Sequence, residues 1–299
     1  MRPIFLFGLN GWEGPYYILS ILIAGYWTYR KMVNAGYTTD DFSDLLTWSL
    51  ISAIIGGRLF FFLFWSPESF LSDPLEFFRV WHGGMSITGC VIIGTLGAFI
   101  CTRIKKWIFF DIANLAAAPL IFGMAIGRVG CFLNGDAYGI PTTLPWGVIL
   151  HPQSIGGFAA AQWAAVLGRP VKLHPTQLYE VIGDLVILAV ILARNKKSEF
   201  IRRNAFILAV GGYGIVRFLN EFLRGDAVPS INLHPHRVFS AIPGEFYPLF
   251  DRIPGSGHLV WHFLSGGQLV SLLMILFALI FLFIPKTQKI GIRVHNSDV

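Results

Sequence analysis

Seven long apolar runs dominate this sequence of 299 residues and constrain its fold more than any other feature. A helix that crosses a bilayer needs about 20 mostly apolar residues. Hydrophobic residues make up 54% of the chain and charged residues only 13%, a balance that argues against a soluble domain and excludes intrinsic disorder. The runs lack the strict alternation of a barrel strand. They predict seven transmembrane helices, at about residues 15–29, 46–66, 85–102, 109–127, 176–193, 204–223 and 266–284.

The positions of lysine and arginine predict how these runs are oriented. Short loops that carry an excess of the two residues stay in the cytoplasm. Most of the 23 lysines and arginines lie in the loops after the first, third and fifth runs and in the segment after the seventh. We therefore expect a single membrane domain over residues 1–299, with the N-terminus outside and the C-terminus in the cytoplasm. The same placement explains the net charge of +6 without a nucleic acid as partner.

Two connections on the predicted outer side are long and rich in proline. They cover residues 140–173 and 226–262, and both are too polar to span a membrane. Connections of this length are uncommon unless they carry a function or are disordered. We expect partly ordered lid segments on the periplasmic side, with a short helix at residues 158–167 in the first of them. The sequence shows no internal repeat of the kind found in inverted-repeat transporters.

Charged side chains inside apolar runs are the sharpest functional signal, because each costs about 2.5–3.5 kcal/mol at the centre of a spanning helix. In and just after the sixth run, four polar residues recur every three or four positions, so they lie on one helical face. They are Tyr213, Arg217, Glu221 and Arg224. Arg217 and Glu221 lie one turn apart and can pair. Two interpretations are open, an internal ion pair that fixes helix packing or a polar stripe that faces a cavity and binds an anion.

A glycine-rich stretch at residues 127–139 places a cation, an amide and a carboxylate close together where the fourth run ends. These groups belong to Arg128, Asn134 and Asp136, and Gly139 closes the stretch. Glycine permits backbone conformations and close approaches that other residues do not. The stretch is either a tight interfacial turn with a local ion pair or part of a binding site.

A third group of polar residues begins the fifth run. Thr176 can cap the helix, and Glu180 lies one turn further on. His174 and Gln177 can reach a lipid head group, although a plain helix start explains them equally well. Asp184 adds a second carboxylate one turn below Glu180.

Arg58 lies within the second run, directly after two glycines, and an arginine there needs a partner. A structural counter-ion role is the favoured interpretation, and a substrate contact is the alternative. The candidate partners are the carboxylates of Asp136, Glu180, Asp184 and Glu221.

Familiar metal and nucleotide motifs are missing from the sequence. The eight histidines are scattered, and there is no HExxH pair, no GxSxG elbow, no P-loop and no CxxC pair. We therefore expect neither a metal site nor a cofactor.

Taken in order along the chain, these motifs resemble the prolipoprotein diacylglyceryl transferase family. Any one of them is weak evidence, but together they cover nearly the whole chain. The matching segments are Gly56 to Arg58, residues 73–86, residues 127–139, the HPTQLYE segment at 174–180, the GYGIVRFLNEFLR segment at 212–224 and residues 265–268.

The resemblance implies a fold of seven spans with the N-terminus outside, together with a specific reaction. Members of this family move a diacylglyceryl group from phosphatidylglycerol to the lipobox cysteine of a preprolipoprotein, which forms a thioether and releases glycerol phosphate. The resemblance therefore implies a protein of the bacterial cytoplasmic (inner) membrane whose partners are membrane lipid and lipobox signal peptides.

On this resemblance, Arg128 and Arg217 are expected to stabilise the phosphate leaving group, with Arg224 as a helper. The attacking thiol must be deprotonated, and its proton acceptor is Glu221, Asp136 or a group that acts through water. Arg128 and Arg224 are also expected to bind substrate. The other expected substrate-binding residues are Asn134, Gly139, Tyr213, His174, Gln177, Tyr17 and Arg58.

The sequence departs from the family pattern at several positions. Thr88 stands where the family has a histidine, and threonine can donate a hydrogen bond but cannot act as a base near neutral pH. Asp136 stands where the family often has glutamate. Cys131 stands where many members have asparagine, and we expect it to be a packing thiol. Tyr17, or its neighbour Tyr16, matches the tyrosine of the family's first span.

Two alternative functions stay open because of these departures. One is a paralogue of the same fold that moves a lipid group to a different acceptor. The other is a membrane protein that binds phospholipid without catalysis.

Overall fold

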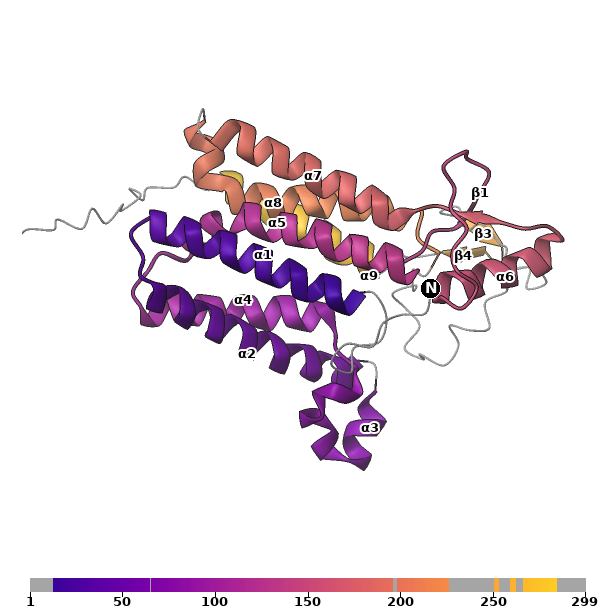
Figure 1. Cartoon of the computed structure of the whole chain (residues 1–299), viewed down its shortest axis with the longest axis horizontal. Coiled ribbons are helices and arrows are strands. Elements are labelled where there is room, and N and C mark those ends of the chain that lie inside the picture. Colours follow the sequence, from indigo (N-terminus) through magenta and orange to yellow (C-terminus); the bar gives the residue numbers. More distant parts are fainter. Residues whose placement is uncertain are drawn as a thin grey trace, which may run out of the picture. The chain divides into compact units, whose positions relative to one another are not determined.

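The computed structural model describes residues 13–64, 66–195, 198–225, 250–252, 259–261 and 266–283, and these are mostly helical (Figure 1). Each apolar run of the sequence coincides with one long helix. The long helices are α1 (Glu13–Asn34), α2 (Thr39–Phe64), α4 (Ile87–Ile104), α5 (Phe109–Asn134), α7 (Thr176–Asn195), α8 (Glu199–Glu221) and α9 (Gly266–Phe283).

Four of these helices, α2, α4, α5 and α7, are long and apolar enough to cross a membrane, by length and composition. The apolar stretch of α9, Gly267–Leu282, is shorter. The predicted class, an α-helical membrane protein, is therefore confirmed, whereas the number of spans and their direction stay predictions.

Capping makes α2 longer than its apolar run. The backbone N–H of Asp41 donates to Thr38 Oγ1 at 3.1 Å, and the backbone N–H of Thr38 donates to Asp41 Oδ2 at 3.1 Å. This reciprocal arrangement satisfies two donors that a helix start otherwise leaves open. The helix consequently begins at Thr39 and not at the predicted residue 46.

The end of α5 corrects one interpretation of the stretch at residues 127–139. The helix continues through Arg128 to Asn134, so most of the stretch is helical and not a tight interfacial turn. The turn follows it, where Gly135 (φ 77°) and Ala137 (φ 50°) take up left-handed backbone conformations. The predicted apolar run ends at residue 127 because Arg128 is charged, but the helix continues past Arg128, whose charge is paired with Glu180.

The connections are short helices and small ribbons. The α2–α4 connection contains α3 (Pro67–Ser72) and two 3₁₀ turns, η1 (Pro74–Phe78) and η2 (Val80–His82). Residues 140–173 contain α6 (Ile155–Leu167) between strands β1 (Pro141–Thr142) and β2 (Lys172–Leu173), which pair antiparallel. A second antiparallel pair joins β3 (Phe250–Arg252) to β4 (Leu259–Trp261).

The predicted short helix at residues 158–167 is confirmed as α6, although it starts earlier. Ser154 caps it, because its Oγ accepts from the backbone N–H of Gly157 at 3.0 Å. Of the predicted segment 226–262, only β3 and β4 lie within the described residues, and the rest lies outside them. The role of both segments as lids stays a prediction.

The described residues form two compact units, and the division falls within α1 and α5. One unit contains residues 21–120. The other contains residues 13–20 and the described residues from 121 to 283.

In the unit of residues 21–120, α2 packs against α4 through glycines. A Cβ atom at Gly97 would lie 2.6 Å from Ser52 Cβ, and one at Gly94 would lie 3.0 Å from Ala53 Cβ. Small residues let two helix backbones approach closely, which is how helices associate in lipid without a hydrophobic driving force.

Arg58 is buried in this unit, and the prediction that a carboxylate side chain pairs with it is wrong. Its guanidinium donates to the backbone carbonyls of Phe77 (2.9 Å) and Gly84 (3.0 Å) and also to those of Gly83 and Glu76. Among the described residues, no carboxylate side chain forms an ion pair with it. The physical reason is local, because the 3₁₀ turns leave carbonyl groups that the helix ladder does not use. Arg58 therefore holds the α2–α4 connection, and its predicted substrate contact finds no support.

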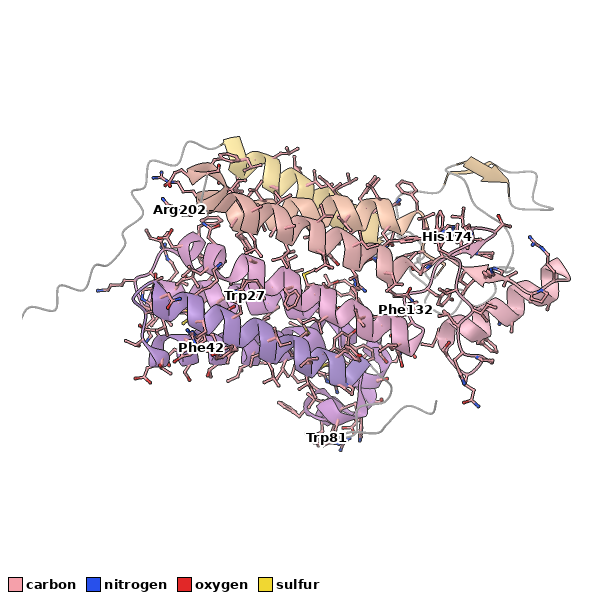
Figure 2. The ribbon with its side chains drawn as sticks, turned by 45° about the horizontal axis from the view of Figure 1, so that its top comes forward. Trp27, Phe42, Trp81, Phe132, His174 and Arg202 are labelled. Carbon is pink, nitrogen blue, oxygen red and sulfur yellow. The ribbon has the colours of Figure 1, made fainter. Side chains whose placement is uncertain are left out.

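In the other unit, α8 packs against both α7 and α9. Val216 of α8 fills the space above Gly183 of α7, and Ala278 of α9 faces Gly211. Arg202 and His174 lie at opposite ends of this group of helices (Figure 2). The end near His174 carries the polar residues discussed below.

Gly89 should be intolerant of a side chain because it sits where α2 and α4 approach each other. A Cβ atom there would collide with the carbonyl oxygen of Gly56 and lie 2.6 Å from Phe60 Cβ. We expect Gly89→Ala to lower the free energy of unfolding by about 1–3 kcal/mol, the usual cost of overpacking. Denaturant titration in detergent micelles measures it.

Gly25→Ala in α1 is the matched control, because a Cβ atom there meets no other described atom within 4 Å. This variant should leave the stability unchanged or raise it by up to about 1 kcal/mol, since alanine is the better helix former. Equal losses in the two variants would contradict the role of the glycine contact.

Candidate active site

A buried carboxylate that joins two arginines is the centre of the candidate site. Glu180 Oε1 accepts from Arg217 Nη1 at 2.6 Å and from Asn220 Nδ2 at 2.8 Å. Its other oxygen, Oε2, forms an ion pair with Arg128 Nε. The Glu180 side chain is 1% exposed. A carboxylate this deeply buried stays ionised only when such partners offset the lost hydration.

A second carboxylate extends the network along α8. Arg217 Nη2 lies 2.7 Å from Glu221 Oε2, and Arg224 Nε lies 3.8 Å from the same oxygen. The predicted pairing of Arg217 with Glu221 is therefore confirmed. Gly267 at the start of α9 packs directly on Glu221, so closely that a Cβ atom there would collide with the carboxylate.

The five charges alternate in sign, and their exposure is unequal. The carboxylates of Glu180 and Glu221 are 1% and 4% exposed. The guanidinium side chains are 13–20% exposed; they belong to Arg128, Arg217 and Arg224. The acidic groups thus lie behind the basic ones, and the network carries one surplus positive charge. An anion that approaches this network meets guanidinium donors first.

Helix direction brings these residues to one place. Arg128 lies near the C-terminal end of α5 and Glu180 near the N-terminal end of α7. Arg217 lies near the C-terminal end of α8, and Gly267 opens α9. Tyr213, one turn before Arg217, accepts a hydrogen bond from Arg128 Nη2 at 3.3 Å. The polar stripe predicted on α8 therefore faces the network along its length.

Backbone hydrogen bonds join the three sequence motifs beside this network. The N–H of Gly139 donates to the carbonyl of His174 at 3.1 Å, and the N–H of Ile140 donates to that of Leu223 at 2.9 Å. A Cβ atom at Gly139 would lie 2.5 Å from the His174 carbonyl oxygen and 2.9 Å from that of Leu223. Gly139 is therefore required for this close approach of backbones, which differs from the substrate contact predicted for it.

The turn after α5 is held by side chains from the start of α7. Gln177 is buried and donates from Nε2 to the carbonyl of Asp136 at 2.5 Å. Thr176 Oγ1 donates to the carbonyl of Ala137 at 2.7 Å, and the first N–H groups of α7, at Leu178 and Tyr179, donate to the carbonyl of Pro175 and not to the Thr176 hydroxyl. Gln177 likewise points at protein backbone, which leaves its predicted contact with a lipid head group without support. Asn134 Nδ2 donates to Asp136 Oδ2 at 3.0 Å.

His174 belongs to a small aromatic cluster. Its Nδ1 lies 3.1 Å from the hydroxyl of Tyr179, and that hydroxyl accepts from Trp146 Nε1 at 2.8 Å. Burial lowers the pKa of His174, so its imidazole is neutral near pH 7.

Tyr17 and Cys131 form a separate contact, with the tyrosine hydroxyl 3.3 Å from the sulfur. Cys131 is buried, as expected of a packing thiol. Thr88 lies exposed in the first turn of α4.

Three members of this region are not among the predicted site residues. The sequence marks Glu180 and Asp184 only as carboxylates of the fifth run and as candidate partners of Arg58, although Glu180 is the shared partner of Arg128 and Arg217. Asn220 was missed as well, and its signal is the spacing of one turn from Arg217 on the same face of α8. Asp184 is fully buried one turn from Glu180, and neither of its oxygens has a hydrogen-bond partner among the described residues.

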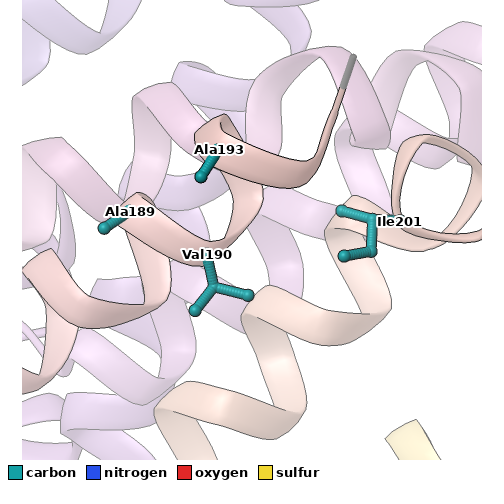
Figure 3. A pocket seen from close by; sticks show the side chains of 4 residues that line it. All are labelled: Ala189, Val190, Ala193 and Ile201. Atoms are coloured by element: carbon teal, nitrogen blue, oxygen red, sulfur yellow. The ribbon is translucent and has the colours of Figure 1, made fainter. Parts of the chain in front are cut away.

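The described residues offer neither a metal cluster nor a polar pocket between α7 and α8. Within residues 13–64, 66–195, 198–225 and the later described segments, no three His, Cys, Asp or Glu side chains group closely enough to hold a metal ion. An apolar hollow of about 460 Å³ between α7 and α8 is lined by Ala189, Val190, Ala193 and Ile201 (Figure 3). These aliphatic side chains offer nothing that binds a phosphate.

Comparison with known proteins decides the family. The model of the prolipoprotein diacylglyceryl transferase family matches residues 10–284. The chain belongs to this family. The resemblance seen in the sequence motifs is thereby confirmed, and the chain is a multi-pass membrane member of a transferase family.

Several similar proteins are named phosphatidylglycerol–prolipoprotein diacylglyceryl transferase. The one from Cereibacter sphaeroides is 34% identical over 283 residues, which cover 91% of this chain and 89% of that protein. The one from Aeromonas salmonicida is 35% identical over 71% of this chain and 73% of its own length. The one from Geobacter sulfurreducens is 31% identical over 94% of this chain and 92% of its own length.

Removing the shared charge should destabilise this transferase-family chain strongly. Glu180→Gln leaves Arg128 and Arg217 without their common counter-ion in a buried place. We expect the free energy of unfolding to fall by about 3–5 kcal/mol, the usual cost of breaking a buried ion pair from one side. Denaturant titration in micelles measures the change.

Glu199→Gln is the matched control. Glu199 also pairs with two arginines, Arg202 and Arg203, but its side chain is 48% exposed. Surface pairs of this kind contribute at most about 1 kcal/mol. A loss in the Glu180 variant no larger than in this control would show that the buried network is not what stabilises the helix group.

Proposed function

We propose that this chain transfers a diacylglyceryl group from phosphatidylglycerol to the cysteine thiol of a prolipoprotein. The observation that carries the proposal is the arginine network of Arg128, Arg217 and Arg224, in which buried carboxylates lie behind partly exposed guanidinium groups. The names of the related proteins supply the substrates, and the network supplies a fitting anion site for a phospholipid head group.

The chemistry of the leaving group explains why arginine is needed. The thiolate sulfur attacks the glyceryl carbon that carries the phosphate, a carbon–sulfur bond forms, and the carbon–oxygen bond breaks. The bonding pair leaves on oxygen, so the departing glycerol phosphate gains a second negative charge. Arg128 and Arg217 are fixed by Glu180 before the substrate arrives, and preorganised donors of this kind stabilise charge that develops in the transition state. Arg224 adds a third cation beside them.

The proton of the thiol goes to a carboxylate at the site. Glu221 is buried and already holds Arg217 and Arg224. Asp136 lies in the turn after α5 and is only partly buried, with Asn134 as its hydrogen-bond donor. We therefore favour Asp136 as the proton acceptor, directly or through water.

The predicted orientation places this chemistry outside the cytoplasm. Arg202 and Arg203 lie at the start of α8, the end that the excess of basic residues assigns to the cytoplasm. The arginine network lies near the opposite end of α8, beside residues 140–173. We propose seven spans, an outer N-terminus, a cytoplasmic C-terminus and residence in the bacterial inner membrane. The segments 140–173 and 226–262 are then periplasmic.

Direct transfer is the test of this function. The purified protein in phosphatidylglycerol vesicles should attach a diacylglyceryl group to the cysteine of a lipobox peptide, a product that mass spectrometry identifies. We expect Arg217→Lys to slow the transfer about 10²-fold or more, because lysine is a point charge without the bidentate fork. Arg202→Lys, at the other end of α8, should transfer at the wild-type rate.

Two outcomes would redirect the assignment. Wild-type rates in the Arg217→Lys variant would remove the phosphate role of Arg217. No adduct from the wild-type protein, with phosphatidylglycerol still bound, would favour a different acceptor or a lipid-binding protein without catalysis.

Thr88 should be dispensable for transfer. Its hydroxyl can donate a hydrogen bond but cannot take a proton near neutral pH, so it is a spacer or a donor where the family has histidine. We expect Thr88→Val to keep measurable transfer of the diacylglyceryl group in the same vesicle assay. Complete loss, in a variant that unfolds at the wild-type denaturant concentration, would show that Thr88 has taken over an essential part of the histidine's work.

A further inference from the structure

The connection between α2 and α4 exposes large apolar side chains. We call residues 66–86 the connecting lobe; it contains α3, η1 and η2. Leu71, Phe78 and Trp81 are 79%, 70% and 69% exposed, and Leu75 is 63% exposed. Trp81 marks the outer part of this lobe in Figure 2. Apolar exposure on this scale marks a surface that meets a partner or a membrane.

We infer that the connecting lobe is seated in the lipid interface of the bilayer, with its exposed aromatic and aliphatic side chains among the acyl chains and head groups. The partner is the lipid itself. Four observations carry this inference, namely the exposed apolar side chains next to those of the spans, the pairing of the lobe's charges, the contacts of Arg58 with its backbone and its aromatic residues.

The apolar surface of the lobe continues that of the neighbouring spans. Both α2 and α4 are candidate membrane spans, and the lobe joins them directly. Phe64 at the end of α2 is 67% exposed, and Ile87 and Val91 at the start of α4 are 69% and 62% exposed. Because these span residues are expected to face lipid, we place the exposed apolar side chains of the adjoining lobe in lipid as well.

The charges of the lobe are largely paired with one another. Arg79 Nη1 lies 2.5 Å from Asp73 Oδ2 and 3.2 Å from Glu76 Oε2, and His82 Nδ1 lies 2.8 Å from Glu76 Oε1. The hydrogen bond from Arg79 lowers the pKa of Asp73, and the one from His82 lowers that of Glu76, so both carboxylates stay ionised in the pairs. Self-paired charges reduce the cost of placing the lobe in a less polar medium.

Arg58 satisfies backbone carbonyl groups of the lobe from inside the protein. Unpaired carbonyl groups cost several kcal/mol in the hydrocarbon region. Arg58 lies within α2 and donates to the carbonyls of Phe77, Gly83 and Gly84, and also to that of Glu76, which accepts from the backbone N–H of Arg79 as well. A loop in water has no need of a buried guanidinium for this purpose, because water serves carbonyl groups equally well.

Aromatic residues give the lobe the composition of a membrane interface. Phe70 and Phe77 pack on Phe62 of α2 inside the lobe, with ring centroids 5.7 and 6.1 Å from it. Phe78 and Trp81 point outward. Tryptophan is enriched at the interface between lipid and water, where an amphipathic ring is most stable. The surface around Phe78 and Trp81 continues toward residues that are expected to face the membrane. Lipid is therefore a better explanation for these outward rings than a protein partner.

Spin-label accessibility in vesicles tests the inference. The full-length protein carries one nitroxide at a time, on Leu71→Cys or Phe78→Cys, in phosphatidylglycerol and phosphatidylcholine vesicles. Collisions with oxygen, which concentrates in lipid, are compared with those of a water-soluble nickel complex. Val91→Cys on α4 is the lipid reference, and Asp40→Cys, at an exposed position at the start of α2 and outside the lobe, is the water reference. Both labels in the lobe should resemble position 91, with several-fold fewer nickel collisions than position 40.

Nickel accessibility at positions 71 and 78 equal to that at position 40 would overturn the inference and leave the surface to a second copy or another protein. A second measurement needs no cysteine. Lipids brominated near the head group should quench less of the total emission in Trp81→Phe than in the wild type. An unchanged quenched fraction would also contradict the inference, and neither result depends on transfer activity.

Discussion

The ion pairs of Glu180 are the interaction on which the candidate site depends. One carboxylate, nearly inaccessible to solvent, fixes Arg128 from α5 and Arg217 from α8. Neither arginine is stable at that depth alone, because an unpaired charge within a membrane helix is costly. The shared carboxylate thus holds two guanidinium groups in place before any ligand is present. The site is thus a cation pair built around an anion.

The two units use arginine in opposite ways. In the unit of residues 21–120, the donors of Arg58 are occupied by carbonyl groups, so this charge fixes the backbone and has no capacity for a ligand. In the other unit, Arg128 and Arg217 share one carboxylate and keep part of their surface exposed. The same side chain is therefore a scaffold in one place and a recognition group in the other, and the difference lies in how many acceptors the protein itself provides.

Sequence patterns predicted the helical fold class and one face of the candidate site, but not the contacts between its helices. Apolar runs located every long helix, and helical spacing placed Tyr213, Arg217 and Glu221 on one face. The centre of the site escaped because Glu180 lies far from Arg217 in the chain, and spacing within one helix carries no information about contacts between helices. Arg58 was misjudged for a related reason, since backbone carbonyls leave no trace in a pattern of side chains. Capping at Thr38 likewise moved a boundary that hydropathy alone defines.

The order of the residues along the chain has a consequence for biosynthesis. Arg128 is translated before Glu180, and Glu180 before Arg217, so the first cation must enter the membrane while its counter-ion has not yet been made. Its position near the end of α5 makes this possible, because a long side chain there reaches water while it waits. Arg128 gains its counter-ion when α7 is inserted, and the network is complete only when α8 supplies Arg217 and Glu221. The complete site therefore forms only after both α7 and α8 have been inserted.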